Sequence, residues 1–256
     1  MPIFEAMKIA LISDIHGNLV ALQAVLKKAD ALSPDAIVCM GDLVGYGPQP
    51  NEVIDIIRQR NIPCVEGNHD AAITGRMPLG FFREPNQTLL KWTMDHLTEE
   101  NTRYLKGLPL TWTSAGLRDA GYPGFEGVDD HLFMMVHASP DRPERWSYLN
   151  SAVLCRKALE HIPHTFCFVG HTHIPGVVAN ELGVFGMEPG FRYVVNPGAV
   201  GQSRDSDQRA SFILLDTDAF TFTIHRVDYT IDRTLAAFDA QGFDMSTRKR
   251  LLHVNI

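Results

Sequence analysis

The chain has 256 residues, with 23 Lys plus Arg against 30 Asp plus Glu, so its formal net charge is −7. This balance argues against an extended nucleic-acid face, because such a face needs clustered basic residues. With 45% hydrophobic and 21% charged residues, the composition is typical of a globular protein and not of a disordered or fibrous one. We expect a single domain over residues 1–256.

Strands and helices alternate in the first part of the chain. Short β-branched and apolar runs predict buried strands over 8–13, 36–41 and 64–67. A helix is expected over 19–29, where apolar residues fall on one face, and another from Pro50, since proline is tolerated in a first turn. The order β-α-β-α-β predicts a parallel sheet.

The sequence pattern after the third expected strand favours helices. Residues 76–110 are expected to form a helical insert or cap, with Thr98 as the N-cap of its second helix. Residues 110–117 look extended, and 119–130 read as a Gly-rich acidic loop. Whether 76–130 form a lid or only structural packing stays open at this point.

Further strands fill the second half of the chain. The same patterns predict strands over 131–139, 165–173, 192–198, 211–218 and 220–228, with helices over 151–161 and about 230–240. Because the late strands follow one another closely, we expect them to form antiparallel hairpins that join a second sheet.

Metal-ligand side chains follow five of the expected strands. They are Asp14 and His16, Asp42, Asn68, His137, and His171 with His173. Any one motif has an ordinary explanation, since Asp14 could cap a helix and a lone His is more often a hydrogen-bonding residue. Seven oxygen and nitrogen donors at successive strand ends exceed the needs of one cation. They fit two sites that share a bridging carboxylate, with water completing each shell.

The ordered series resembles a known family. Asp14-Ile-His16-Gly-Asn, Gly41-Asp42, Gly67-Asn68-His69-Asp70, His137 and Gly170-His171-Thr-His173 resemble the calcineurin-like metallophosphoesterase superfamily, in its small prokaryotic phosphodiesterase-like branch. The resemblance implies an α/β fold, a four-layer αββα sandwich of two mixed β-sheets flanked by helices. It also implies one metal on Asp14, His16, Asp42 and His173, and a second on Asp42, Asn68, His137 and His171, with Asp42 bridging.

The resemblance further implies a metal-dependent phosphoric ester hydrolase. Two divalent ions would hold a bridging hydroxide that attacks phosphorus in line, and the substrate would be a phosphodiester or a small phosphomonoester. Manganese is expected by family likeness, while nitrogen and oxygen ligands also permit Fe, Zn, Co or Ni. The resemblance places His69 outside the metal shell, where we expect it to protonate or stabilise the leaving group.

One motif of this sequence differs from the pattern of the superfamily's phosphoprotein phosphatases, and the difference concerns the substrate. Phosphoprotein phosphatases of this superfamily read GDxxDRG after the second strand, whereas this chain reads GDLVGYG. Gly45 stands where those enzymes place the Asp that partners the catalytic His, and Tyr46 stands where they place a phosphate-binding Arg. The departure therefore argues against phosphoprotein phosphatase and dinucleotide tetraphosphate hydrolase activity.

Four further residues are candidates for substrate binding: Asn18, Tyr46, Arg204 and Arg209. Asn18 could touch phosphate, but capping of the first helix is favoured. Arg204 and Arg209 could each reach a phosphate oxygen through a forked contact, or instead pair with neighbouring aspartates on the surface, which is slightly favoured.

Two other classes of function compete with an enzyme. A non-catalytic scaffold on the same fold, like the retromer subunit that resembles this superfamily, would have no use for a leaving-group acid such as His69. A nuclease is disfavoured for long duplexes by the charge balance, though not for short or single-stranded substrates. The oligomeric state is left open.

The cellular setting follows from what the sequence lacks. Its four cysteines form no CxxC pair, its first residues do not form a secretory signal, and no apolar run reaches the length of a membrane span. We therefore expect a cytoplasmic protein with a small phosphate-ester substrate and no membrane partner.

Overall fold

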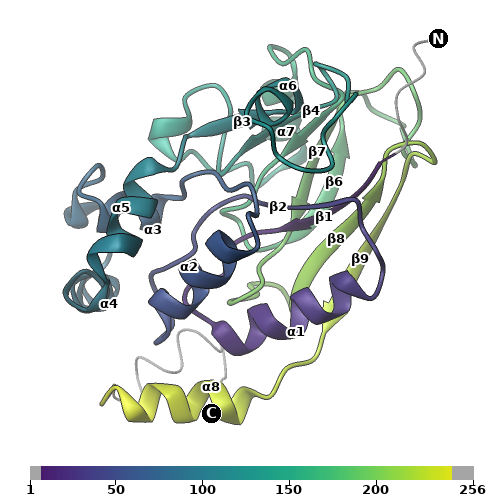
Figure 1. Cartoon of the computed structure of the whole chain (residues 1–256). Coiled ribbons are helices and arrows are strands. Elements are labelled where there is room, and N and C mark those ends of the chain that lie inside the picture. Colours follow the sequence, from purple (N-terminus) through teal and green to yellow (C-terminus); the bar gives the residue numbers. More distant parts are fainter. Residues whose placement is uncertain (1–6, 244–256) are drawn as a thin grey trace.

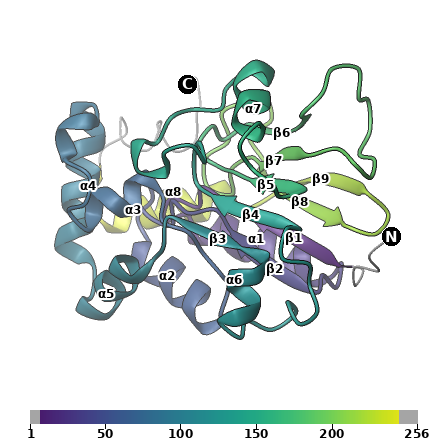
Figure 2. The same cartoon turned by 90° about the horizontal axis from the view of Figure 1, so that it is seen from above.

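The computed structural model describes residues 7–243, so the outer ends of the expected domain, 1–6 and 244–256, lie outside the described residues. Two sheets stack face to face, with helices on their outer faces (Figures 1 and 2). This arrangement confirms the four-layer αββα sandwich.

The first sheet has the strand order β2-β1-β8-β9. Its strands are β2 (Ala36–Cys39), β1 (Lys8–Ile12), β8 (Ala210–Asp216) and β9 (Thr221–Val227). β1 is central, parallel to β2 and antiparallel to β8. Since side chains alternate along a strand, Ile9 and Leu11 pack between the two sheets, while Ala10 and Ile12 pack on the helix side.

The second sheet has the order β3-β4-β5-β7-β6. Its strands are β3 (Thr111–Thr113), β4 (Phe133–Val136), β5 (Phe166–Phe168), β7 (Tyr193–Pro197) and β6 (Pro175–Ala179). Phe166 and Phe168 of β5 point into the core between the sheets, and Cys167 between them packs on the outer side. The FCF run is therefore buried on both faces.

Helices cover both outer faces. α1 (Leu19–Asp30) packs against β8 and β9 and contacts α2 (Pro50–Gln59) and α8 (Ile231–Ala240), as Figure 1 shows. α7 (Ala152–Leu159) packs on β6 and β7 of the other sheet, and α6 (Ser114–Asp119) contacts β3.

The expected helical insert is present at one end of the molecule (Figure 2). It contains a 3-10 turn, η1 (Leu79–Phe81), and the helices α4 (Glu84–His96) and α5 (Glu99–Gly107). The Thr98 hydroxyl accepts a hydrogen bond from the Asn101 amide at 3.1 Å, which confirms the expected cap. Both helices pack on α3 (Asn68–Ile73), a short helix that the sequence analysis did not predict.

Several expected elements were wrong. Residues 64–67 make only a single bridge, between Cys64 and Cys39, because the chain turns at Gly67 into α3. Only 111–113 of the expected extended stretch is a strand, since the Thr113 hydroxyl caps the Gly116 amide and starts α6.

Of the late strands, 192–198 lies in the second sheet as expected, but the hairpin of 211–218 and 220–228 was placed in the wrong sheet. β8 and β9 do form an antiparallel hairpin, but β8 pairs with β1 and so extends the first sheet. β6 was missed, and it forms the antiparallel edge of the second sheet beside β7. None of the helices between residues 7 and 243 is long and apolar enough to cross a membrane.

Candidate metal centre

The seven predicted donors converge at the ends of strands from both sheets. Asp14 and His16 follow β1, and Asp42 follows β2. Asn68 opens α3, whereas His137 follows β4 and the GHTH motif follows β5. All seven side chains are buried, with at most 7% of any residue exposed. The structure thus brings together in space the residues that the motifs place far apart in the sequence.

One cluster consists of Asp14, His16, Asp42 and His173, whose donor atoms all lie within 4.8 Å of one another. His173 Nε2 is 3.1 Å from Asp14 Oδ1 and 3.1 Å from His16 Nε2. His16 Nε2 is 3.7 Å from Asp42 Oδ2. These four donors could surround one cation.

A second cluster consists of Asp42, His137 and His171, joined by Asn68. His137 Nε2 lies 3.4 Å from Asp42 Oδ2 and 3.2 Å from His171 Nδ1. The Asn68 side-chain oxygen is 3.2 Å from the same His137 nitrogen. Asp42 takes part in both clusters, as expected of a bridging ligand.

Backbone carbonyls orient three of the imidazoles. Nδ1 of His16 lies 3.1 Å from the Val44 oxygen, and Nδ1 of His137 lies 2.6 Å from the Met40 oxygen. Nδ1 of His173 lies 2.6 Å from the carbonyl of Gln202. Because a carbonyl only accepts hydrogen bonds, each Nδ1 carries a proton, so each Nε2 faces the centre and can offer its lone pair to a cation.

The buried polar atoms fit a cation. With Nδ1 protonated, His16 and His173 point two lone pairs at each other across 3.1 Å, which is unfavourable unless a positive charge lies between them. Oδ2 of Asp14 accepts from the Ser13 hydroxyl and the His171 amide, but its Oδ1 is buried without a hydrogen-bond partner. The donor set therefore fits metal ions.

The pKa shifts of the buried ligands also favour positive charge in the centre. Burial opposes ionisation of Asp14, yet the neighbouring His173 and His137 together outweigh it and hold the pKa of Asp14 well below its usual range. Burial also opposes a charge on His137, but Asp42 and Asp14 outweigh it and raise the pKa of His137 to about 10. Both carboxylates thus attract positive charge into a buried site.

Backbone strain is concentrated at the same residues. Nine non-glycine residues within 7–243 have a positive φ, and five of them are candidate ligands: Asp14, His16, Asp42, His171 and His173, at φ between 51° and 66°. This left-handed region costs about 1–2 kcal/mol per residue. Such strain persists where the surrounding structure holds a functional geometry.

His69 lies beside the first cluster without entering it. Its ring centroid is 4.7 Å from those of His16 and Tyr46, and 4.9 Å from that of Phe82. Its Nδ1 is buried and has no hydrogen-bond partner. A Cβ built on Gly45 would lie 2.2 Å from that nitrogen, and the φ of Gly45 is +129°. His69 therefore fits only because position 45 has no side chain.

The structure does not bring two of the substrate-binding candidates to the centre. Asn18 is fully buried, where its oxygen caps Ala21 and its amide donates to the carbonyl of Gly201, so the expected capping role is confirmed. Arg209 is exposed and pairs with Asp207 at 2.7 Å, which confirms for this residue the alternative that it forms a surface ion pair.

The other two candidates lie next to the centre. Tyr46 is buried with its ring against His16 and His69. Nη2 of Arg204 lies 3.5 Å from the Tyr46 hydroxyl.

Sequence reasoning missed two residues that contact ligands. The Ser13 hydroxyl donates to Asp14 at 2.7 Å, and its position directly before Asp14 was the available signal. Tyr148 stacks on His171 with ring centroids 3.9 Å apart and remains 47% exposed. No motif or periodicity marks Tyr148, because it lies in an irregular loop.

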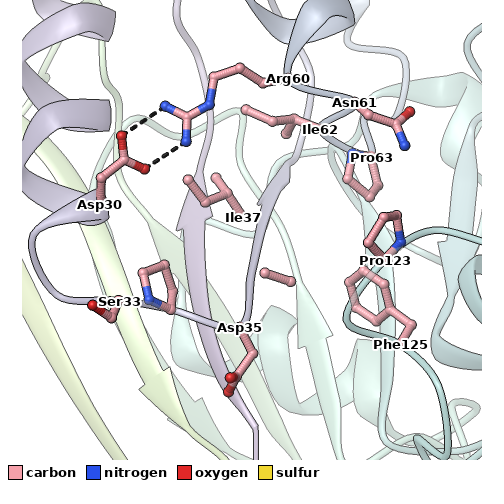
Figure 3. A pocket seen from close by; sticks show the side chains of 12 residues that line it. Asp30, Ser33, Asp35, Ile37, Arg60, Asn61, Ile62, Pro63, Pro123 and Phe125 are labelled. Carbon is pink, nitrogen blue, oxygen red and sulfur yellow. Dashed lines mark hydrogen bonds and ion pairs between the residues drawn. The ribbon is translucent and has the colours of Figure 1, made fainter.

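A separate cavity of about 310 Å³ lies near the opposite end of β2 (Figure 3). Asp35 and Ala36 at the start of that strand line it, with a bidentate ion pair between Asp30 and Arg60 at its rim. Since Asp42 follows the other end of β2, this cavity is not part of the metal centre.

A four-layer α/β sandwich with two buried donor clusters sharing one carboxylate is the architecture of a metallophosphoesterase. Residues 7–219 match the model of the calcineurin-like phosphoesterase superfamily domain, so the chain belongs to this family.

Individual proteins are similar to this chain over most of its length. A metallophosphoesterase from Sphaerobacter thermophilus is 37% identical, with a TM-score of 0.77 over 98% of this chain and 100% of that one. An uncharacterized protein from Methanocaldococcus jannaschii is 35% identical over 236 residues, which are 88% of this chain and 89% of that protein. A hypothetical protein from Pyrococcus horikoshii shares the fold, with 21% identity and a TM-score of 0.76 over 96% of this chain and 97% of its own.

Proposed function

We propose that this protein is a two-metal phosphoesterase that hydrolyses a phosphodiester or a small phosphomonoester. The observation that carries the proposal is the pair of buried donor clusters that share Asp42, with lone pairs turned inward and Asp14 Oδ1 unpartnered. Manganese is the first metal to test, and Fe, Zn, Co and Ni suit the same nitrogen and oxygen donors.

The charge of the ligand shell supports an anionic substrate. Two divalent ions bring four positive charges, and among the ligands only Asp14 and Asp42 offset them. The filled centre would thus be a positive pocket suited to a phosphate group. When bound, the ions supply an activated water and neutralise charge on the phosphoryl oxygens.

His69 is proposed to act on the leaving group. It touches the first cluster through its ring contact with His16, and its amide donates to Asp42 at 2.8 Å, so the backbone holds it in place. We expect its side chain to donate a proton or a hydrogen bond to the departing oxygen. His69→Ala should keep the metal content and lower kcat by about 10²- to 10⁴-fold. Unchanged turnover would remove this role.

The test of the proposed function is a metal-reconstituted activity panel. The protein is loaded in turn with Mn, Zn, Fe, Co or Ni and offered a phosphomonoester, a phosphodiester and a pyrophosphate ester. Hydrolysis by the wild type, lost in Asp42→Asn, supports the proposal. If no ester is cleaved with any of the metals while the metals still bind, a non-catalytic scaffold replaces it.

A further inference from the structure

Arg204 is a half-buried arginine that forms no ion pair with any residue of the described part of the chain. Within residues 7–243, its Nη2 approaches two neutral oxygens, the Tyr46 hydroxyl and the Gln202 side-chain oxygen, each at 3.5 Å. Neighbouring arginines differ, since Arg209 pairs with Asp207 and Arg226 pairs with Asp205. Contacts this long are weak, so among residues 7–243 most of the five guanidinium donors of Arg204 have no good partner.

The segment that carries Arg204 is fastened to the metal centre. The carbonyl of Gln202 accepts from Nδ1 of His173 at 2.6 Å, and the Arg204 amide approaches the His173 carbonyl at 3.4 Å. Arg204 therefore cannot move far from the first cluster without disturbing one of its ligands.

Tyr46 fixes the direction of the side chain. Its ring lies 4.5 Å from that of His16 and 4.7 Å from that of His69, and its hydroxyl meets Arg204. The Tyr46 ring also contacts His69, so the hydroxyl that Arg204 approaches belongs to a residue packed against His69. The guanidinium thus lies on the side of the centre that His69 occupies.

We propose that Arg204, aimed by the Tyr46 hydroxyl, binds a terminal oxygen of the substrate phosphate. The inference rests on the proposed phosphoesterase function and names the group that orients its substrate. An arginine suits this task because its planar fork matches phosphate oxygens. A phosphomonoester has three terminal oxygens and a second negative charge, so it gains more from Arg204 than a diester does.

The experiment compares Arg204→Met with Arg209→Met in the Mn-loaded protein. Arg209 is a matched control, because it lies on the same segment but pairs with Asp207 away from the centre. Affinity for inorganic phosphate is measured by calorimetry, and kcat and KM are measured for p-nitrophenyl phosphate and bis(p-nitrophenyl) phosphate. Metal content and Tm are recorded for every variant.

We expect Arg204→Met to weaken phosphate binding, and kcat/KM for the monoester, by about 10- to 100-fold, since a hydrogen bond to a charged group is lost. The loss for the diester should be smaller. Arg209→Met should stay within about twofold of the wild type, and Arg204→Lys should recover only part of the loss, because lysine keeps the charge but not the fork.

Two results would overturn the inference. One is equal behaviour of Arg204→Met and Arg209→Met in an active enzyme. The other is a lower Tm or metal content in Arg204→Met with unchanged phosphate affinity, which would mark a purely structural residue. A wild type that binds phosphate through Arg204 but cleaves no ester would leave the anion site standing and refute the proposed function alone.

Discussion

Gly45→Ala tests the geometry around His69 most directly. A Cβ at position 45 would lie 2.2 Å from Nδ1 of His69, and alanine would have to adopt a φ of +129°. A backbone in this region costs about 1–3 kcal/mol, and forcing an atom into a packed interior costs about 1–3 kcal/mol more. We therefore expect the unfolding free energy to fall by about 2–6 kcal/mol.

The effect on activity should be selective. The added methyl group must displace the His69 ring, so turnover should fall by about 10²- to 10⁴-fold, as for loss of a general acid. Metal content should persist, because His69 is outside both donor clusters. The assays are thermal unfolding, metal analysis and steady-state turnover on an ester that the wild type cleaves.

Gly75→Ala is the matched control. Gly75 also has a positive φ, +79°, but nothing lies within 4 Å of a Cβ built there. This variant should lose about 1–2 kcal/mol of stability to strain alone and keep full turnover. Wild-type turnover in Gly45→Ala would refute the reasoning, and so would loss of metal together with turnover, which would place His69 in the metal shell.

Three further predictions follow from the centre and its surroundings. Asp42→Asn should weaken both metal sites together, and metal analysis that finds only one ion lost would contradict the bridging role. Chelation should lower the Tm of the metal-loaded protein, since ions that bind only the folded state stabilise it. Burial opposes ionisation of Asp205, but Arg226, with hydrogen bonds from Ser203 and the Asp207 amide, outweighs it and lowers the pKa of Asp205 below its usual value. The ion pair between Asp205 and Arg226 therefore stabilises the fold fully above the unfolded-state pKa of Asp205, which is about 4. This stabilisation is lost as the pH falls through the lower folded-state pKa. The difference in unfolding free energy between wild type and Asp205→Asn should therefore shrink in acid, which unfolding measurements at several pH values would show.

Much of the centre could be predicted because its donors sit at strand ends. Strand pairing fixes where each strand stops, so Asp14, Asp42 and His137 are brought together by the two sheets and by the register of their strands. The number of donors already predicted two sites, and the resemblance added which ligands belong to each.

Other features depend on tertiary contacts that no local sequence pattern predicts. The sequence pattern of the β8–β9 hairpin is compatible with either sheet. The pairing of β8 with β1 places the hairpin in the first sheet. Arg204 and Arg209 look alike in sequence, yet Asp207 holds one at the surface while Tyr46 lies beside the other. Irregular loops take their shape from tertiary contacts, so no local pattern separates the two arginines.

The net charge of −7 does not decide what the centre binds. Surface charges are screened over about 8–10 Å, whereas buried charges are screened much less. With the two proposed ions, the buried positive charge exceeds that of Asp14 and Asp42, and Arg204 adds to it. We therefore expect the acidic exterior to repel long polyanions while the proposed metal-loaded centre attracts a single phosphate group. This combination favours small phosphate esters over extended nucleic acids as substrates.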